Sequence, residues 1–503
     1  MVPVAVDRYT GTGPALGRLI LLHALSSIAD QIAARGLHER FAQLSLLMMS
    51  TVHAELESSQ SRAYEGALSR CRDVLTAILG EPHERSFDVK FWDGSVDRGN
   101  RSPSPFTLVL NRPAALRRML LPPNELSIVE AYLSGDVEIE GSMEAASNLT
   151  DVIGNRLHSP AKVAKLVALV LRLPGKADDD LADARFPERA RKLGPRHTPV
   201  RDAAAIQFHY DVGNEFYKLW LDKRMVYSCA YFETPTATLD EAQEAKLDHI
   251  CRKLRLKPGE RMLDIGCGWG GLIMHAAEHY GVDATGITLS ENQAALARER
   301  IEEAGLADRC RVAIRDYRTL SAGDAYDKIS SVGMIEHVGL THLPVYFQSA
   351  YRALKGGGLF LNHGIVSLRE ARPKSVGKKI FAKFWKADAF IDTYVFPDGK
   401  LTATAAVVRA AEAAGFEVRD MESLREHYAM TLRHWVKSLE DKSRDATALV
   451  GQHTFRVWRL YMAASANAFA TAGINVVQTL LAKPDAQGRS MIPLTREDLY
   501  ADV

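Results

Sequence analysis

Short apolar runs alternate with amphipathic helical stretches between residues 260 and 363. The apolar runs lie at 261–265, 283–288, 310–314, 327–332 and 358–363. Their Val, Ile and Leu content is typical of strands that are buried on both faces. Regular alternation of strands and helices predicts a mostly parallel sheet covered by helices on both sides. We therefore predict an α/β, Rossmann-like domain over residues 201–503.

The N-terminal part of the chain follows a different pattern. Residues 1–80 are predicted to be helical, whereas 87–91, 106–110 and 136–141 alternate like strands and are followed by helices near 142–171. This pattern predicts a smaller α+β domain over residues 1–175. The charged stretch at 176–200, bounded by prolines and glycines, predicts a linker.

Composition and charge narrow the function classes. The 503 residues carry a net charge of +1, so no bulk basic surface indicates nucleic-acid binding. Five cysteines without a C-x-x-C pair predict free thiols in a cytoplasmic protein and no metal site. The apolar stretch 19–29 is shorter than the about 20 residues of a spanning helix. It lacks a signal-peptide cleavage site, and we expect it to pack in a core, with a membrane or partner surface as the alternative.

The most informative motif is the glycine-rich turn after the strand at 261–265. It reads Gly266-x-Gly268-x-Gly270-Gly271, and Asp264 precedes it. Glycines let backbone N–H groups approach a ligand where a Cβ would collide. The spacing departs from the dinucleotide fingerprint and suits S-adenosylmethionine better, because its sulfonium and α-ammonium are positive and it has no pyrophosphate. The alternative is a tight turn without a ligand.

Polar residues follow the next strands at the edge where a parallel sheet binds ligands. The second strand leads to Thr288, Leu289 and Gln293, with Ser290 placed to cap a helix, and the third leads to Asp316 and Tyr317. We expect Asp316 to accept a hydrogen bond from an adenine amino group and Tyr317 to stack on the ring. The alternative for Asp316 is simple surface exposure.

The fourth and fifth strands end near Glu336 and His363. A lone carboxylate in an apolar stretch must be paired or functional, because its burial is costly. A single histidine here is more often a satisfied core residue, but two such groups on neighbouring strand ends indicate a shared site. Aromatic segments at 208–217 and 225–232 either close over the cofactor or form a packed cluster. Apolar residues of the helical region from 426 onward are placed to wall an acyl-sized groove.

Seven segments in order resemble the cyclopropane-fatty-acyl-phospholipid synthase family, which includes the mycolic acid cyclopropane synthases. They are FHYDVGNEFY, MVYSCAYF, LDIGCGWGG, GITLSENQ, GMIEHVG, YVFPDG and HYAMTLRHW, within residues 205–480. The resemblance implies a class I methyltransferase domain and transfer of a methylene carbon from S-adenosylmethionine to the cis double bond of phospholipid acyl chains. The first 200 residues resemble, more loosely, the extra domain of longer bacterial synthases. That likeness implies lipid binding, a homodimer and transient contact with the inner face of the membrane.

The resemblance also assigns residues. It implies cofactor contacts at Tyr227, Ser228, Gly266, Gly268, Thr288, Leu289, Gln293, Asp316 and Tyr317, beside the Asp264 read from the motif. It implies a bicarbonate ion held by Cys229, Glu336, His363, Ile365 and Tyr428. That anion would deprotonate a carbocation on the acyl chain before ring closure. We expect protonated His363, Tyr428 and backbone N–H groups to act as donors, and Cys229 to be a packing residue. Glu336 is expected either to be protonated or to bond to the bicarbonate hydroxyl.

Four alternatives remain open. One is methyl or methylene branching of the acyl chain without ring closure, and a second is a methyltransferase acting on a small molecule. A third is a lipid-binding or scaffold protein without activity. The fourth concerns the basic and aromatic segment 372–386, which suits an anionic lipid surface but equally suits a solvated helical face.

Overall fold

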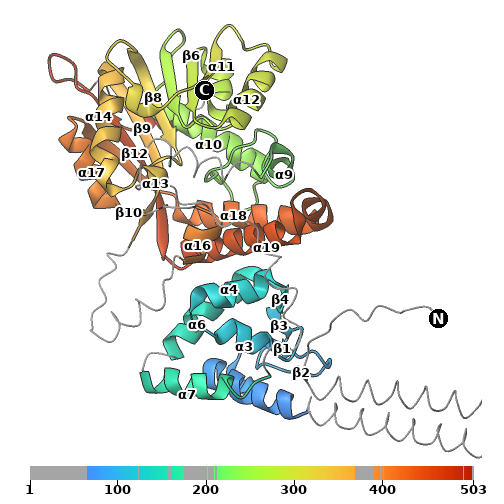
Figure 1. Cartoon of the computed structure of the whole chain (residues 1–503). Helices are drawn as coiled ribbons and strands as arrows, with labels where there is room; N and C mark the ends of the chain where they lie inside the picture. The colour runs from blue at the N-terminus through green and yellow to red at the C-terminus, as the bar shows by residue number, and fades with distance from the viewer. Residues whose placement is uncertain are drawn as a thin grey trace, which may run out of the picture. The chain divides into compact units, whose positions relative to one another are not determined.

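A computed structural model gives the fold (Figure 1). It describes residues 65–122, 124–156, 160–174, 201, 209, 212–368, 389–396, 399, 401–490 and 492–500. The chain divides into two compact units, Met1–Cys71 and Arg72–Val503, and the second contains both sheets. The apolar stretch 19–29, the linker 176–200 and the basic segment 372–386 lie outside the described residues.

A small sheet occupies the first part of the second unit. Its strand order is β2-β1-β3-β4, and β1 pairs parallel to β3. The strands are β1 (Asp88–Lys90), β2 (Val96–Asp97), β3 (Phe106–Leu110) and β4 (Val137–Gly141). The accompanying helices are η1 (Pro82–Glu84), α3 (Ala115–Leu120), α4 (Glu125–Leu133), α5 (Met143–Ala146), α6 (Leu149–Arg156) and α7 (Pro160–Val170). The predicted strand at 106–110 is β3, and those at 87–91 and 136–141 match β1 and β4 within two residues.

The large sheet has the strand order β11-β12-β9-β8-β5-β6-β7, and β10 pairs with β9. Pairs among β5 to β10 are parallel, whereas β12 and β11 are antiparallel. The strands are β5 (Arg261–Ile265), β6 (Asp283–Thr288), β7 (Cys310–Ile314), β8 (Tyr326–Val332), β9 (Leu354–Ser367), β10 (Thr402–Ala403), β11 (Glu417–Ser423) and β12 (Ile474–Ala482). The mostly parallel sheet of the sequence prediction is confirmed.

Helices cover both faces of the large sheet, as the buried strands require. One hydrophobic core lies between one face of the large sheet and three helices, α10 (Leu239–Leu254), α11 (Gly271–Tyr280) and α12 (Glu291–Glu303). A second hydrophobic core lies between the opposite face of the sheet and four helices, η3 (Tyr317–Thr319), α13 (Ile335–Val338), α14 (Leu343–Ala353) and α17 (Thr404–Ala413). The short helix η4 (Leu340–His342) precedes α14. A capping box sets the start of α10, because Thr238 accepts from the N–H of Glu241 and the Glu241 carboxylate accepts from the N–H of Thr238.

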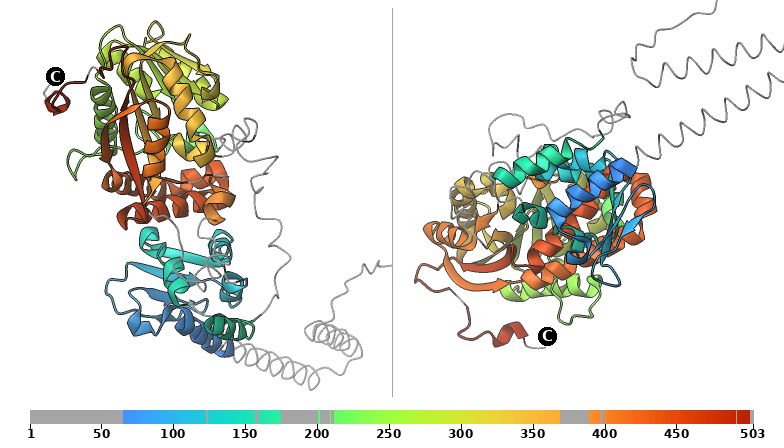
Figure 2. Two further views of the ribbon diagram at one scale, coloured as in Figure 1. Left: turned by 90° about the vertical axis from the view of Figure 1, so that its left-hand side faces the viewer. Right: turned by 90° about the horizontal axis from the view of Figure 1, so that it is seen from below.

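A third aromatic core lies where α9 (Asn214–Lys218), α18 (Arg425–Asp441) and α19 (Ser443–Ala470) meet. Figure 1 shows α18 and α19 side by side across one end of the large sheet, near α13, which follows the carboxyl end of β8. Both views of Figure 2 also place these two helices together. The helix at 443–470 contains a kink at Gly451, whose φ is 76°. The helices α16 (Ala389–Tyr394) and α20 (Glu497–Tyr500) complete the described elements.

Within the described residues, no helix combines the length and apolar character that crossing a bilayer requires. The same residues contain no cluster of three or more histidine, cysteine or acidic side chains arranged to hold a metal ion. All five cysteines are buried, and none of them is in a disulfide.

Candidate active site at the carboxyl end of the parallel strands

A cavity opens at the carboxyl ends of β5, β6 and β8. Its walls come from the glycine-rich turn, the segment before α10, α10 itself, and the loops after β6, β7 and β8. The lining residues include Tyr227, Ser228, Lys246, Asp264, Gly266, Gly268, Thr288, Leu289, Gln293, Tyr317, Met334 and His337. Of the ten predicted cofactor residues, all except Asp316 line this cavity.

The glycine-rich turn is held tightly against β6. The N–H groups of Gly266 and Cys267 both donate to the carbonyl of Ile287, at 2.8 and 3.1 Å. Gly266 has a φ of +83°, and a Cβ there would collide with the Met334 side chain. Gly268 has a φ of +54°, and a Cβ there would enter open space within the cavity wall. Crowding therefore requires glycine at the first position, and at the second the positive φ favours glycine, which leaves the open space free for a ligand.

Asp264 and Lys246 place two buried, opposite charges at the base of the cavity. Asp264 is 3% exposed and accepts a 2.7 Å hydrogen bond from the Ser330 hydroxyl, and burial raises its pKa to about 6. Lys246 of α10 is 2% exposed and donates to the Ser228 Oγ at 2.9 Å. Burial lowers the Lys246 pKa to about 8, and the carboxylates of Asp222 and Asp264 oppose this effect.

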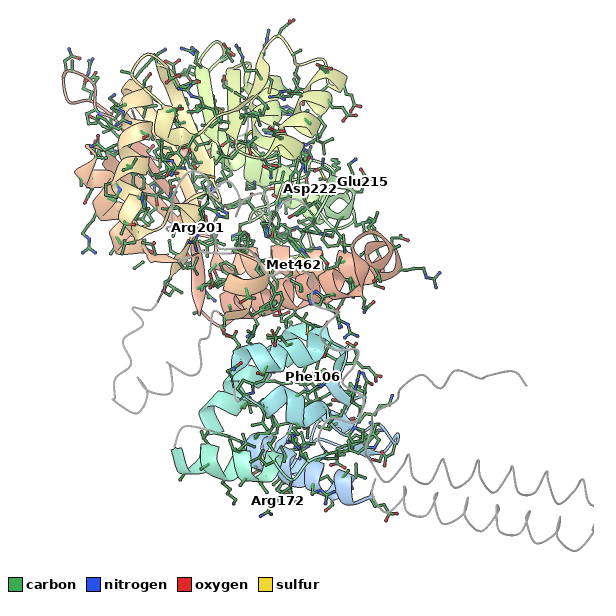
Figure 3. The ribbon with its side chains drawn as sticks, in the orientation of Figure 1. Phe106, Arg172, Arg201, Glu215, Asp222 and Met462 are labelled. Atoms are coloured by element: carbon green, nitrogen blue, oxygen red, sulfur yellow. The ribbon has the colours of Figure 1, made fainter. Side chains whose placement is uncertain are left out.

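Asp222 shapes the loop that carries Tyr227 and Ser228 toward the cavity. Figure 3 labels it on the segment after α9. Its carboxylate accepts from the N–H groups of Val226 and Arg224, at 2.8 and 2.9 Å. A buried carboxylate that receives two backbone donors fixes the local turn, so the following Tyr227 and Ser228 hold a defined position.

In the loop after β6, Ser290 caps the following helix, as predicted. The Ser290 Oγ accepts from the N–H of Gln293 at 3.2 Å, which confirms that Ser290 caps α12. The Thr288 hydroxyl donates to the Gln293 Oε1 at 2.9 Å. This bond ties together two predicted cofactor contacts and orients the Gln293 amide.

In the loop after β7, Asp316 pairs with Arg318. Its carboxylate accepts from the backbone N–H of Arg318 and from the Arg318 guanidinium, at 2.6–3.0 Å. Tyr317 lines the cavity, packed edge-on against Tyr346 with the ring centroids 5.4 Å apart. Tyr317 is thus placed to stack on a ligand ring, while the Asp316 contact to an adenine amino group stays a prediction.

Glu336 is held by the backbone of β9. Its Oε1 accepts a 2.6 Å hydrogen bond from the N–H of Ile365, while Oε2 is shielded from solvent and has no hydrogen-bond partner among the described residues. Burial raises the Glu336 pKa to about 7. A carboxyl group that is readily protonated near neutral pH agrees with the expectation for this residue.

His363 is the second shielded group. It is 2% exposed, its Nδ1 lies 3.2 Å from the Gln478 Nε2, and its own Nε2 has no partner among the described residues. Burial lowers its pKa to about 3. The expectation of a protonated His363 is therefore wrong, because the desolvated ring stays neutral near pH 7 and can donate only through a neutral N–H.

Cys229 and Tyr428 belong to the aromatic core, and Ile365 and Tyr227 pack against it. The Cys229 thiol donates to the carbonyls of Ala230 and Leu424, and burial raises its pKa well above the usual range. An undissociated thiol is a poor nucleophile, which supports the packing role expected for Cys229. The five residues assigned to the anion do not line the cofactor cavity. Their chain neighbours Ser228, Met334 and His337 do.

Comparison with known proteins places the chain in a family. The family model described as "Mycolic acid cyclopropane synthetase" matches residues 197–479. The chain belongs to this family. A second model, a domain of unknown function, matches residues 74–155.

Individual proteins agree with this placement in the mycolic acid cyclopropane synthetase family. The chain is 42% identical over 414 residues to a "Probable fatty acid methyltransferase" of Pseudomonas putida, which covers 82% of this chain and 95% of that protein. It is 37% identical over 286 residues to "Cyclopropane mycolic acid synthase 1" of Mycobacterium tuberculosis, covering 55% and 95%. The crystal structure of mycolic acid cyclopropane synthase CmaA1 "complexed with SAH and CTAB" superposes with a TM-score of 0.51 at 35% identity, covering 58% and 99%. The fold is therefore that of class I S-adenosylmethionine-dependent methyltransferases.

Lys246 is the residue of this site that sequence reasoning missed. It lies in an amphipathic helix among other charged residues, so its type alone gives no signal. Its position does, because Gln243, Leu247 and Ile250 share its buried side of α10. A lysine on the apolar face of a helix next to a glycine-rich motif is a feature that could have been flagged.

Proposed function

We propose that this protein transfers a methylene carbon from S-adenosylmethionine to the cis double bond of unsaturated acyl chains in membrane phospholipids and forms a cyclopropane ring. The cationic acyl chain would be deprotonated by bound bicarbonate. One observation carries the proposal: two shielded polar atoms, the Glu336 Oε2 and the His363 Nε2, have no hydrogen-bond partner among the described residues. Both residues adjoin the cofactor cavity through a neighbour that lines it, since His337 follows Glu336 in the chain and Val332 pairs with His363 across β8 and β9. Membership of the mycolic acid cyclopropane synthetase family supports the choice of reaction.

The cavity residues fit S-adenosylmethionine. Asp264 offers a buried carboxylate to a positive group, Tyr317 offers a ring face, and Gly268 leaves open space in the wall. When bound, S-adenosylmethionine supplies a methyl group that is electrophilic because it is attached to a sulfonium. The relative crystallised with SAH supports this choice of cofactor.

The two shielded atoms fit a small anion. A neutral His363 can donate through Nε2, and a protonated Glu336 can donate through Oε2. When bound, bicarbonate supplies a base close to the reacting chain. While Glu336 is protonated, both donors are neutral, so the anion meets no fixed like charge, and the shielding strengthens each hydrogen bond.

The aromatic core provides an environment in which a carbocation can survive. Tyr227, Trp435 and Trp458 pack with ring centroids 5.2–6.1 Å apart, and Trp435 and Trp458 are almost fully buried. Water would convert the cation to an alcohol, so an apolar wall that excludes it protects the product. The negative faces of the rings also favour a nearby positive charge.

Branching without ring closure is a second candidate. The relative at 42% identity is described as a probable fatty acid methyltransferase. Both reactions begin with attack of the alkene on the sulfonium methyl, and they differ in the fate of the resulting cation. Loss of a proton from the new methyl group with ring closure gives the cyclopropane, whereas loss of that proton after a hydride shift gives a methylene branch.

The substrate defines where the enzyme works. We propose a cytoplasmic homodimer that contacts the inner face of the membrane transiently, where the phospholipid acyl chains are reached. Co-sedimentation with liposomes at rising salt tests the contact: binding should need anionic lipid and weaken with salt. Binding that ignores both variables would contradict this part of the proposal.

Lipid analysis of a bacterial host that expresses the protein tests the reaction. Mass spectrometry should show unsaturated chains that gain one CH₂ and no longer take up hydrogen under mild catalytic hydrogenation. A gained CH₂ with a reducible double bond would establish methylene branching instead. Lipids identical to those of a host that expresses the His363→Ala variant would reject both reactions.

A further inference from the structure

A row of polar residues crosses three adjacent strands of the large sheet. Glu422 of β11 lies opposite Gln478 of β12, and Gln478 lies opposite His363 of β9. Residues paired across strands point to the same face. Here it is the face covered by α10, because Leu361 and Leu480, two residues from His363 and Gln478, share a core with Ile250 and Leu254.

Helix α10 presents two residues to this row. His249 and Lys253 are four residues apart and so lie on one side of the helix. The Lys253 Nζ donates to the Gln478 Oε1 at 2.9 Å and to the Glu422 Oε2 at 2.5 Å, and the His249 Nε2 lies 2.8 Å from the same Glu422 oxygen. Lys253 and Gln478 are 2% and 0% exposed.

The chemistry of these groups fixes the orientation of the Gln478 amide. A lysine ammonium has donors only, so the group that faces Lys253 must be the amide oxygen. The amide NH₂ then faces the His363 Nδ1, at 3.2 Å. An NH₂ group only donates, so Nδ1 must accept, and the proton of the neutral imidazole resides on Nε2.

We propose that Lys253 and Gln478 are positioning residues that hold His363 as the Nε2–H tautomer, which aims a hydrogen-bond donor at the anion used in the reaction. The inference rests on the proposed function for the identity of that anion, whereas the tautomer itself follows from the contacts. The shielded Nε2 of His363 has no other partner among the described residues. Reversal of the amide would present a lone pair there and repel an anion.

The surrounding charges explain why Lys253 keeps this orientation. Asp420 of β11 lies 3.5 Å from its Nζ, in addition to Glu422. Two carboxylates on one side and the amide oxygen on the other surround the ammonium. Turning the amide would place its NH₂ against the ammonium, which is unfavourable in a buried site.

Nitrogen NMR of the whole wild-type protein tests the tautomer directly. The protein is labelled with ¹⁵N-histidine, and the His363 signals are identified by their loss in the His363→Asn variant. We expect a neutral ring with Nε2 protonated and Nδ1 unprotonated at neutral pH, with and without bicarbonate. A ring protonated on Nδ1, or on both nitrogens, would overturn the proposal.

The Gln478→Glu variant tests the consequence. A carboxylate only accepts, so Nδ1 must then carry a proton, and in a neutral ring Nε2 therefore has none. We expect the NMR signals to exchange roles and the half-saturating bicarbonate concentration to rise roughly tenfold or more, as for loss of a hydrogen bond to a charged group. The kcat at saturating bicarbonate should stay within about twofold, because the variant weakens binding of the anion rather than its later steps.

A neighbouring substitution controls for general damage to β12. Thr479→Val changes a buried residue on the opposite face of the strand and should leave both the tautomer and the bicarbonate dependence unchanged. A rise in half-saturating bicarbonate in Gln478→Glu without a change of tautomer would indicate a merely structural role. If wild-type activity does not depend on bicarbonate, the proposed function fails in that part, and the NMR result still decides the tautomer.

Discussion

Replacement of Glu336 by glutamine should both increase the stability of the fold and abolish activity. The structure shows why the fold tolerates the change: the amide oxygen of glutamine can keep the 2.6 Å bond from the Ile365 N–H. The amide NH₂ would replace a shielded oxygen that has no partner among the described residues. Glutamine, however, replaces the acidic O–H proposed to hold the anion with an amide NH₂, which is a weaker donor, so no product should form while cofactor binding is retained.

The stability effect comes from the raised pKa of Glu336. Burial raises it from an ordinary value of 4.5 to about 7. The folded protein therefore binds more protons than the unfolded chain between pH 4.5 and 7, and Glu336 lowers stability progressively as the pH rises through this window. At about 1.4 kcal/mol for each tenfold change in ionisation constant, the full loss above pH 7 is about 3 kcal/mol.

Urea unfolding of the wild type and of Glu336→Gln at pH 5 and pH 8 measures this effect. The variant should gain up to about 3 kcal/mol relative to the wild type on going from pH 5 to pH 8. Comparison of the two pH values cancels any effect of the amide that does not depend on pH. An equal difference at both pH values, or a variant that loses stability relative to the wild type on going from pH 5 to pH 8, would mean that Glu336 is stably ionised and would refute the reasoning.

Three further substitutions test individual parts of the site. His363→Ala should abolish product formation with unchanged cofactor affinity in calorimetry, and near-normal turnover would remove the residue from the anion site. Gly268→Val forces a branched side chain into a position with a positive φ, where the Cβ points into open space. Cofactor affinity should therefore fall at least about tenfold. An unchanged affinity would mean that the cofactor binds elsewhere. Lys246→Met leaves the Ser228 hydroxyl and Asp264 without a buried cation. Calorimetry should show a cofactor affinity that is roughly tenfold lower. An equal loss of affinity in the control variant Lys223→Met, at an unrelated lysine, would point to a non-specific charge effect.

The parallel part of the sheet was predictable because its strands are apolar on both faces. The predicted runs 261–265, 283–288 and 310–314 are β5, β6 and β7. The two antiparallel strands were not predicted. In β11 most side chains are exposed or half-buried, so charged residues interrupt the apolar pattern, and β12 follows a long helical stretch in which strand–helix alternation is lost.

The residues proposed to contact a ligand were easier to predict than the residues that hold them in position. Glu336 stands out because a carboxylate in an apolar stretch needs an explanation. The predicted protonated state of His363 was wrong because burial of its ring depends on the packing of segments that are distant in the sequence. The partners Lys253 and Gln478 lie 225 residues apart in the chain, and no local pattern in a single sequence indicates such a pair.

Incubation of the purified protein with methyl-deuterated S-adenosylmethionine and vesicles of unsaturated phospholipid tests the central claim most directly. We predict fatty acids that gain a CD₂ unit within a three-membered ring, with one deuteron released to solvent for each ring formed, and only when bicarbonate is present. Vesicle lipids that stay unlabelled while the cofactor is consumed on a small molecule would contradict the claim.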